Sequence, residues 1–192
     1  MEYHRRASVI DNLDSPAIAE LLDFLNTLDY PKNETRKYVR KKQPEKTRGP
    51  SAKSVIRKKL QEYLESRNWE VEKPLYLKGN PPGSKLHFIR DRVGIVWAMG
   101  NRITIGTDIL RLERAYHPAQ SLIDIGVLIC PTSDFEDYYF GIDGSSTENL
   151  ITFEELLQYM EMMGELFYIP VLIVGIDSPR ARKKKIINDC DE

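Results

Sequence analysis

Cysteine is scarce in this sequence of 192 residues: Cys130 lies inside an apolar run and Cys190 in a polar tail. Neither has a nearby partner at the spacing of a zinc or redox site, so we expect both to be structural thiols. No apolar run approaches the roughly 20 residues that span a bilayer, and residues 1–12 are charged where a signal peptide carries its apolar core. We therefore expect a soluble, cytoplasmic protein that does not contact a membrane.

The signatures of the common enzyme classes are also missing. The sequence has no Gly-rich phosphate loop, no His-Glu-x-x-His pair and no Gly-x-Ser-x-Gly elbow. Its three histidines, His4, His87 and His117, are far apart. His117 precedes a proline at a predicted helix end. At such a position a histidine more often complements the partial negative charge of the helix end than takes part in catalysis. These absences remove the usual starting points for assigning an enzyme.

Length and composition fit a single domain over 1–192, with a basic loop over 32–53 and a flexible basic tail over 179–192. The net charge is only -1, but residues 32–59 contain twelve Lys and Arg against two Glu. Such a concentration exceeds what a solvated helix face needs and favours contact with phosphates, although a solvated face remains the alternative. The residues expected to contact phosphates are Arg36, Arg40, Lys41, Lys42, Lys46, Arg48, Lys53, Arg57 and Lys58.

The periodicity of apolar residues predicts alternating helices and strands. Helices are expected over 15–30, 54–67, 107–116 and 152–167, and strands over 71–77, 86–99, 122–130 and 171–176. Ser15 and Pro16 suit a helix start, and Thr152 and Glu155 have the spacing of a capping box. The continuous apolar strands separated by helices imply parallel crossovers. We therefore predict an α/β fold with a central mixed β-sheet flanked by helices.

Three segments carry a resemblance to a known family: 91–101 (DRVGIVWAMGN), 122–131 (LIDIGVLICP) and 170–176 (PVLIVGI). In their order, their spacing and their local sequence, these segments resemble the core of the BglII and BstYI type of restriction endonuclease, which belongs to the PD-(D/E)xK nucleases. The tripeptide at 45–47 and the Asn-Trp pair at 68–69 extend the likeness. The resemblance implies a restriction-endonuclease-like core, double-stranded DNA as partner and a homodimer.

The family cuts DNA with an Asp before the central strand, then a Glu on it and a Lys, Gln or Glu two residues later. These groups hold Mg²⁺, which prefers hard oxygen ligands and activates the attacking water. Carried over one at a time, the positions fall at His87, Val96 and Ala98. Val and Ala offer no ligand, and a neutral His is a poor one for Mg²⁺. The resemblance therefore implies a protein without cutting activity, metal or other cofactor.

Two alternatives stay open. Asp91, Asp108 and Glu113 could form a relocated Mg²⁺ site in an active type II-like endonuclease, although Asp108 and Glu113 are more simply interpreted as solvent-facing helix charges. In the second alternative, the chain is a non-catalytic module that pairs with an active nuclease.

Recognition of bases does not depend on the cutting centre. Asn101 matches an Asn that contacts bases in the family, and Ser145 and Ser146 resemble a Ser-rich recognition loop. Arg102 and Thr104 are the candidate neighbours. Residues 141–149 can equally be interpreted as an ordinary polar loop.

Overall fold

The structure is a computed structural model that describes residues 3–5, 15–28, 52–75, 85–135, 150–163 and 166–178. Most of the predicted basic loop over 32–53 and all of the tail over 179–192 lie outside the described residues.

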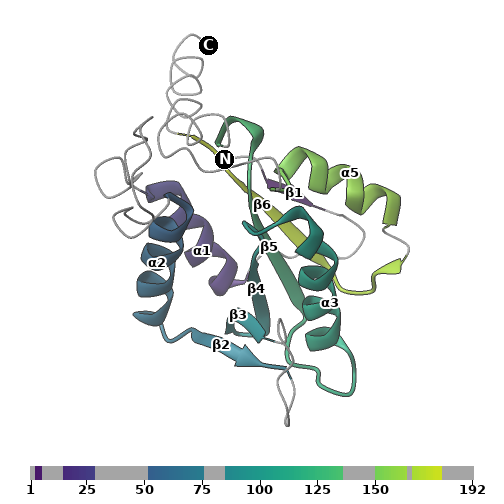
Figure 1. Ribbon diagram of the computed structural model, residues 1–192. Helices are drawn as coiled ribbons and strands as arrows, with labels where there is room; N and C mark the ends of the chain where they lie inside the picture. Colours follow the sequence, from purple (N-terminus) through teal and green to yellow (C-terminus); the bar gives the residue numbers. More distant parts are fainter. Residues whose placement is uncertain are drawn as a thin grey trace, which may run out of the picture.

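One six-stranded sheet, with strand order β1-β6-β5-β4-β3-β2, forms the centre of the fold (Figure 1). Its strands are β1 Tyr3–Arg5, β2 Glu70–Pro74, β3 Lys85–Arg90, β4 Val93–Trp97, β5 Ile125–Pro131 and β6 Val171–Ile176. The three strands β4, β5 and β6 are parallel, with Ile95 opposite Val127 and Val127 opposite Leu172, whereas the remaining pairs are antiparallel. The predicted mixed sheet is confirmed.

Helices cover both faces of this sheet, as Figure 1 shows. The helices are α1 Pro16–Thr27, α2 Ala52–Glu65, α3 Ile105–Tyr116 and α5 Phe153–Met163, with a 3₁₀ helix, η2, at Arg102–Thr104. The core is divided accordingly: Ile95 and Trp97 pack on the side of α1 and α2, and Val96 and Leu128 on the side of α3 and α5. Burial on both faces explains why β4, β5 and β6 are apolar throughout rather than alternating.

Two predicted helix starts differ in how they form. At α5, the Glu155 N–H donates to Oγ1 of Thr152 over 3.3 Å and the Thr152 N–H donates to Oε2 of Glu155 over 3.1 Å. The predicted capping box is therefore confirmed. At α1, Pro16 occupies the first helical position, but the Ser15 side chain makes no capping hydrogen bond.

The segment 86–99, predicted as continuous apolar structure, is divided by a two-residue hairpin between β3 and β4. Arg90 pairs with Val93, and the two loop residues Asp91 and Arg92 both have positive φ angles, of 47° and 62°. This geometry matches the twist of the flanking strands and usually contains Asn, Asp or Gly. The sequence has no Gly at the turn, so the break was not predicted.

None of the helices in the described part of the chain has the length and apolar content that a bilayer-spanning segment requires.

Candidate functional site

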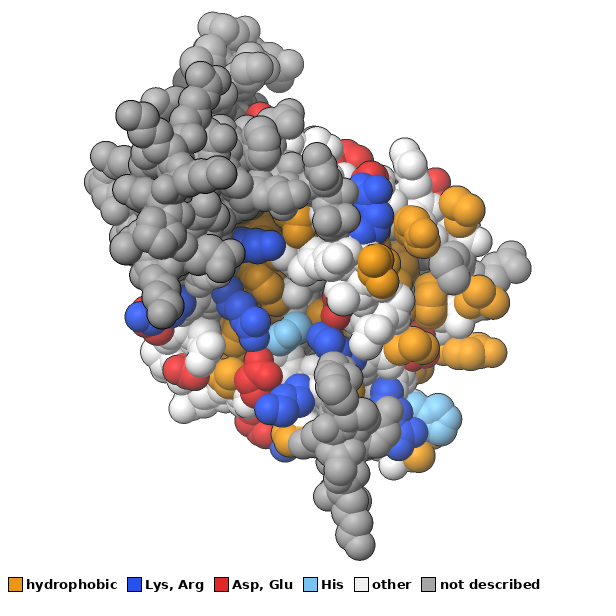
Figure 2. Space-filling model, viewed as in Figure 1, with side chains coloured by type: hydrophobic (Ala, Val, Ile, Leu, Met, Phe, Trp, Pro, Cys, Tyr) orange, Lys and Arg blue, Asp and Glu red, His pale blue; other side chains and the backbone are white. Residues whose placement is uncertain are grey.

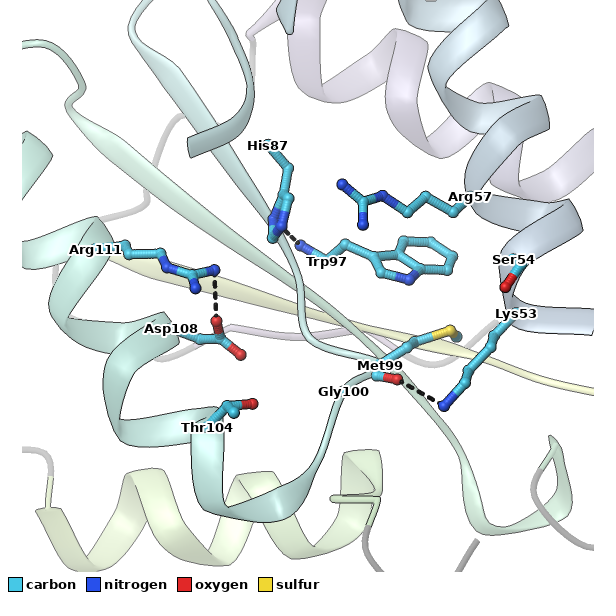
Figure 3. A pocket seen from close by; sticks show the side chains of 10 residues that line it. All are labelled: Lys53, Ser54, Arg57, His87, Trp97, Met99, Gly100, Thr104, Asp108 and Arg111. Atoms are coloured by element: carbon cyan, nitrogen blue, oxygen red, sulfur yellow. Dashed lines mark hydrogen bonds and ion pairs between the residues drawn. The ribbon is translucent and has the colours of Figure 1, made fainter. Parts of the chain in front are cut away.

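A hollow of about 310 Å³ lies where β4 ends, between the first turns of α2 and the middle of α3 (Figure 3). From α2 it is lined by Lys53 and Arg57, and from α3 by Asp108 and Arg111. His87 of β3 also lines the hollow. The region beyond the carboxyl end of parallel strands is where α/β sheets usually hold ligands. Figure 2 shows Lys and Arg side chains gathered around this hollowed part of the surface.

The backbone beyond β4 forms the floor of the hollow. After Trp97 the chain passes through Met99 and Gly100 before turning into η2, and all three residues line the cavity. The Lys53 ammonium donates to the Met99 carbonyl over 3.4 Å. This contact joins the N-terminal end of α2 to the end of β4.

His87 is held as a neutral hydrogen-bond donor. The Trp97 backbone N–H donates to its Nδ1 over 2.9 Å, so in the neutral ring the hydrogen is on Nε2. Burial, together with the smaller influence of the nearby Arg57 and Arg111 charges, lowers the pKa of His87 to about 3. The ring therefore remains uncharged near neutral pH and offers one N–H group.

Asp108 is the one carboxylate that the described residues place in the hollow, and only 5% of it is exposed. Arg111, one turn further along α3, pairs with it at 2.8 Å. Burial raises the pKa of Asp108 to about 6, and the opposing effect of Arg111 is smaller. The interpretation of Asp108 as a solvent-facing helix charge is therefore wrong, because α3 turns this residue toward the sheet.

The hollow carries an excess of positive charge: three cationic side chains, Lys53, Arg57 and Arg111, face one carboxylate. Arg57 also pairs with Glu72 of β2 at 2.7 Å, at the rim of the site. Magnesium prefers several hard oxygen ligands, but the one carboxylate inside is already paired with a guanidinium. Among the described residues, moreover, no three His, Cys, Asp or Glu side chains lie close enough to hold a metal ion together. The donor set of the hollow does not fit Mg²⁺.

Of the three family cutting positions, only His87 lines the hollow. Val96 is completely buried and Ala98 is 2% exposed, and both pack into the apolar core beneath α3. They point to the same side of the sheet, as their spacing of two requires. A carboxylate and an amide at these positions would lie on the α3 side of β4, where this chain has hydrocarbon instead.

The three acidic alternatives are separated in space. Asp91 lies in the β3–β4 turn, where its carboxylate pairs with Arg90 at 3.1 Å. The carboxylate of Glu113 accepts the N–H groups of Tyr168 and Ile169 over 2.8 and 3.0 Å. Glu113 is thus half-buried in a structural role rather than facing solvent, and only Asp108 reaches the hollow.

The candidate base-reading residues form an exposed corner next to the hollow. Oδ1 of Asn101 caps η2 by accepting the Ile103 N–H over 3.0 Å, and Thr104 donates through Oγ1 to the Asn101 carbonyl over 2.7 Å. Arg102 pairs with Glu155 of α5 at 2.5 Å. Thr104 also lines the hollow, so the corner is continuous with it. Ser145 and Ser146 lie outside the described residues.

The predicted phosphate contacts divide into three groups. Lys53 and Arg57 line the hollow, whereas the Lys58 side chain is 78% exposed and lies near Glu62 at 3.6 Å. The others lie outside the described residues: Arg36, Arg40, Lys41, Lys42, Lys46 and Arg48. Sequence reasoning missed Arg111, for which the only signal was its position three residues after Asp108 on a predicted helix.

Exposed apolar side chains form a second surface feature on the α3 and α5 side of the molecule, seen as an orange group in Figure 2. These side chains are Leu110, Tyr159, Met162, Leu166 and Tyr168, with exposed fractions from 47% to 84%. The hydrogen bond between the Tyr168 N–H and Glu113 joins the segment after α5 to α3. Exposed groups of this kind on a protein surface commonly mark contact with another molecule.

Comparison with known proteins gave two kinds of match. Residues 1–176 match the family described as restriction endonuclease BglII/BglIII. The structure is similar to that of restriction endonuclease BglII complexed with a DNA 16-mer, with a TM-score of 0.67 and 13% identity. That alignment covers 92% of this chain and 77% of the BglII chain. It is similar also to free BglII, with a TM-score of 0.58, 12% identity and coverage of 92% and 78%. No curated protein sequence matched.

Proposed function

The chain belongs to the BglII/BglIII restriction endonuclease family, and from this membership we propose that it binds duplex DNA without cutting it. The observation that carries the proposal is the charge of the hollow. Three cationic side chains and one paired carboxylate line this hollow together with His87, one of the three family cutting positions. Binding of phosphates needs cations, whereas Mg²⁺-dependent cleavage needs free carboxylates. The residues present favour the first activity.

Sequence preference is the next part of the proposal. Asn101, Arg102 and Thr104 are exposed beside the hollow, so their side chains are accessible to base edges when a phosphate lies at the hollow. Amide and guanidinium groups are the side chains that most often read bases in the major groove. From the family resemblance we propose that Ser145 and Ser146, which lie outside the described residues, also contact bases. Contacts to phosphate would then position the duplex, and this corner would select its sequence.

We propose further that the protein acts in the cytoplasm as a homodimer. The exposed apolar group on the α3 and α5 side supplies a surface that a second copy would bury, in which Met162, Tyr168 and Leu166 are the most exposed side chains. A two-fold symmetric dimer reads a palindromic site. The expected target is therefore a short palindrome.

The test is selection from a randomised duplex library at about 150 mM salt, the physiological value, with Mg²⁺ present and the same samples examined for cut DNA. Enrichment of a palindrome without cleavage is the expected result. If the protein binds duplex DNA no more tightly than an unrelated protein of equal charge, the proposal is overturned. A protein-interaction module is then the better description.

One observation favours an active nuclease as a second candidate. Asp108 is a buried carboxylate whose pKa is raised to about 6, and perturbed groups of this kind concentrate at catalytic sites. In this case the library experiment yields Mg²⁺-dependent cleavage, and Asp108→Ala abolishes it. Cleavage that survives Asp108→Ala would exclude this residue as the relocated ligand.

A further inference from the structure

Nearly every polar side chain in the hollow is a hydrogen-bond donor. Lys53 offers an ammonium, Arg57 and Arg111 offer guanidinium groups, and His87 offers the N–H on Nε2 that its contact with Trp97 leaves available. Figure 3 shows the His87 ring between the side chains of Arg57 and Arg111, in agreement with the influence of both cations on it. A ring held neutral adds a donor without adding charge or a group that titrates near pH 7.

The existing ion pairs do not balance this set. Within the hollow Asp108 neutralises one of the three cations, and at the rim Glu72 pairs with Arg57. Among the residues that the structure describes, one positive charge of this set therefore remains in excess even when both carboxylates are counted. Because the hollow is concave, its field on a bound anion is screened less than that of lysines on a flat surface.

We propose that this hollow is an oxyanion site that holds one phosphate group through Arg57, Arg111 and His87. The ligand is a phosphate of the DNA backbone or a free phosphate group, which share the same charge and acceptor oxygens. The DNA form of this inference rests on the proposed function. In that form the protein binds the DNA backbone through fixed donors that include His87, one of the family cutting positions.

Guanidinium groups suit such a ligand better than ammonium groups do. Their planar N–H pairs match the oxygens of a phosphate two at a time, which fixes its orientation as well as its charge. Arg57 and Arg111 come from opposite sides of the sheet, on α2 and α3, so a phosphate between them would connect the two helical layers.

Asp108 makes the site sensitive to pH. Protonation of its carboxyl below about pH 6 removes the negative charge that opposes the ligand and competes for Arg111. The other ionisable groups that face the site are Lys53 and Arg57 on α2, Arg111 on α3 and His87 on β3, and the His87 ring is neutral in this range because its pKa is lowered to about 3. Binding of a phosphodiester should therefore strengthen as the pH falls from 7 through 6.

The first arm of the test measures binding of duplex DNA by fluorescence anisotropy. Arg57→Gln and Arg111→Gln should each weaken binding about tenfold or more, the usual effect of removing a charged hydrogen bond. The control Lys73→Gln removes an equal charge from β2, where Lys73 pairs with Glu70 outside the hollow. It should leave affinity within about twofold, as substitutions away from such contacts usually do.

Arg111→Gln leaves the buried Asp108 without its partner and can therefore lower stability. The double variant Asp108→Asn with Arg111→Gln removes both charges of the pair and keeps the hollow occupied by amides of similar size. It should fold, as judged by thermal unfolding followed by circular dichroism, and should still bind DNA about tenfold more weakly than the parent.

The second arm measures the thermal stability of the protein with inorganic phosphate, which distinguishes a free ligand from the DNA backbone. Stabilisation that is lost in Arg57→Gln but kept in Lys73→Gln supports an oxyanion site whatever happens with DNA. If the parent protein binds no duplex, the proposed function fails and this arm alone decides the inference. If it binds duplex, but both hollow variants behave like Lys73→Gln and phosphate does not stabilise it, the oxyanion site is refuted and the proposed function stands.

Discussion

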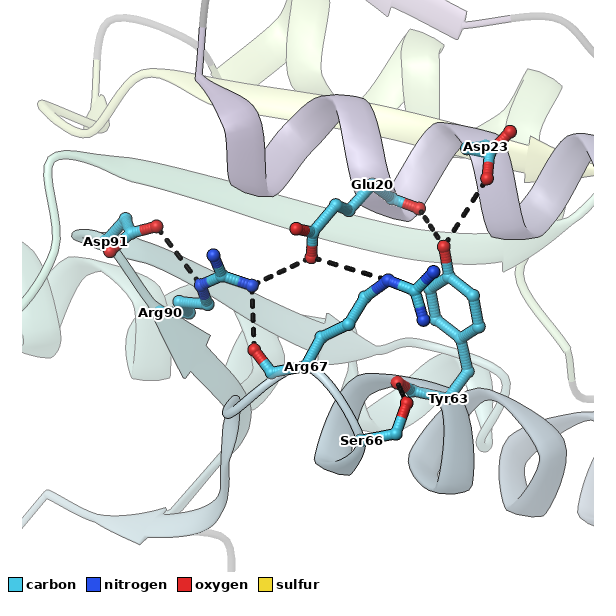
Figure 4. A network of polar contacts seen from close by, with 7 residues as sticks. All are labelled: Glu20, Asp23, Tyr63, Ser66, Arg67, Arg90 and Asp91. Atoms are coloured by element: carbon cyan, nitrogen blue, oxygen red, sulfur yellow. Dashed lines mark hydrogen bonds and ion pairs between the residues drawn. The ribbon is translucent and has the colours of Figure 1, made fainter.

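The two ends of α2 carry polar clusters of opposite character. Lys53 and Arg57 at the first end contribute to the hollow, where positive charge is in excess. Beyond the other end, Arg67 joins a network with Glu20 of α1 and Arg90 of β3 (Figure 4). One helix thus supplies cations both to a site with fewer carboxylates than cations and to a site whose cations are matched by partners.

The network at the second end is closed by its own contacts. Arg90 donates to Oε2 of Glu20 over 2.8 Å and to the carbonyl of Arg67 over 2.7 Å. The guanidinium of Arg67 lies 3.8 Å from the centre of the Tyr63 ring, a cation–π contact, and the Tyr63 hydroxyl donates to the Glu20 carbonyl over 3.4 Å. Asp91 adds another carboxylate beside Arg90. Each cation here has an acidic or aromatic partner, so the cluster needs no ligand.

The difference indicates what each cluster does. Groups that satisfy one another hold α1, α2 and β3 together, and they fix the position of α2 relative to the sheet. Cations gathered in a hollow with too few carboxylates contribute little to stability and are suited to bind an anion. The predictions below separate these two roles by affecting one end of α2 at a time.

The largest effect is expected from the double variant Lys53→Gln with Arg57→Gln. Duplex DNA affinity should fall about a hundredfold. The slope of log affinity against log salt concentration should become shallower by about the amount that two phosphate contacts contribute. The free energy of unfolding should fall by only about 1 kcal/mol, because the variant loses one partly exposed ion pair, Arg57 with Glu72, and one long hydrogen bond from Lys53. Fluorescence anisotropy across a salt series measures the affinity, and urea denaturation measures the free energy of unfolding. A large loss of stability with unchanged binding would show that these two cations have a structural role instead of a binding role.

The opposite result is expected for Arg90→Ala in the closed network. Removing Arg90 leaves the half-buried Glu20 with Arg67 at 4.0 Å as its remaining cation, and leaves the Arg67 carbonyl without this donor. The free energy of unfolding should fall by about 2 kcal/mol, the usual cost of unsatisfied groups of this kind. DNA affinity at a temperature where the variant is folded should be unchanged. Urea denaturation provides the measurement, with Lys73→Gln as the control.

A smaller effect is expected from Asp108→Asn, which removes the titrating group of the hollow. The pKa of Asp108 in the folded protein, about 6, lies above its ordinary value of 3.8. The folded state therefore binds the proton more tightly, and this contribution to stability is complete below about pH 3.8 and lost as the pH rises through 6. Relative to the variant, the parent protein should gain stability on acidification from pH 7 to 4. Parallel unfolding curves of the two proteins over this range would contradict the burial of Asp108.

The smallest effect is expected from Mg²⁺. The carboxylate in the hollow is already paired, so removal of divalent ions with a chelator should change DNA affinity by less than about twofold, within the range of simple ionic screening. Thermal unfolding with and without Mg²⁺ should coincide. A metal site in the hollow would be indicated if Mg²⁺ stabilised the protein more than sodium chloride of equal ionic strength does, and if Asp108→Asn removed that difference.

The sequence by itself determined the elements of the fold. Continuous apolar runs specified the buried parallel strands β4, β5 and β6, and helical periodicity together with the Thr152 capping box specified the start of α5. These signals are local, because side-chain alternation and capping depend on residues within a few positions of one another. The family resemblance came from the same buried segments. Strand β1 was not predicted, since its three residues are too few to show a period.

The tertiary structure alone decided where the charges meet. Arg57, His87 and Arg111 come from α2, β3 and α3, and no spacing along the chain indicates that they share one hollow. The tertiary structure decided also that Asp108 is buried. Asp91 instead pairs with Arg90 at the β3–β4 turn, and Glu113 accepts backbone N–H groups of the segment after α5. Electrostatic environment depends on distances between residues remote in sequence, and on the burial that packing imposes. These quantities exist only once the sheet and its two helical layers are assembled.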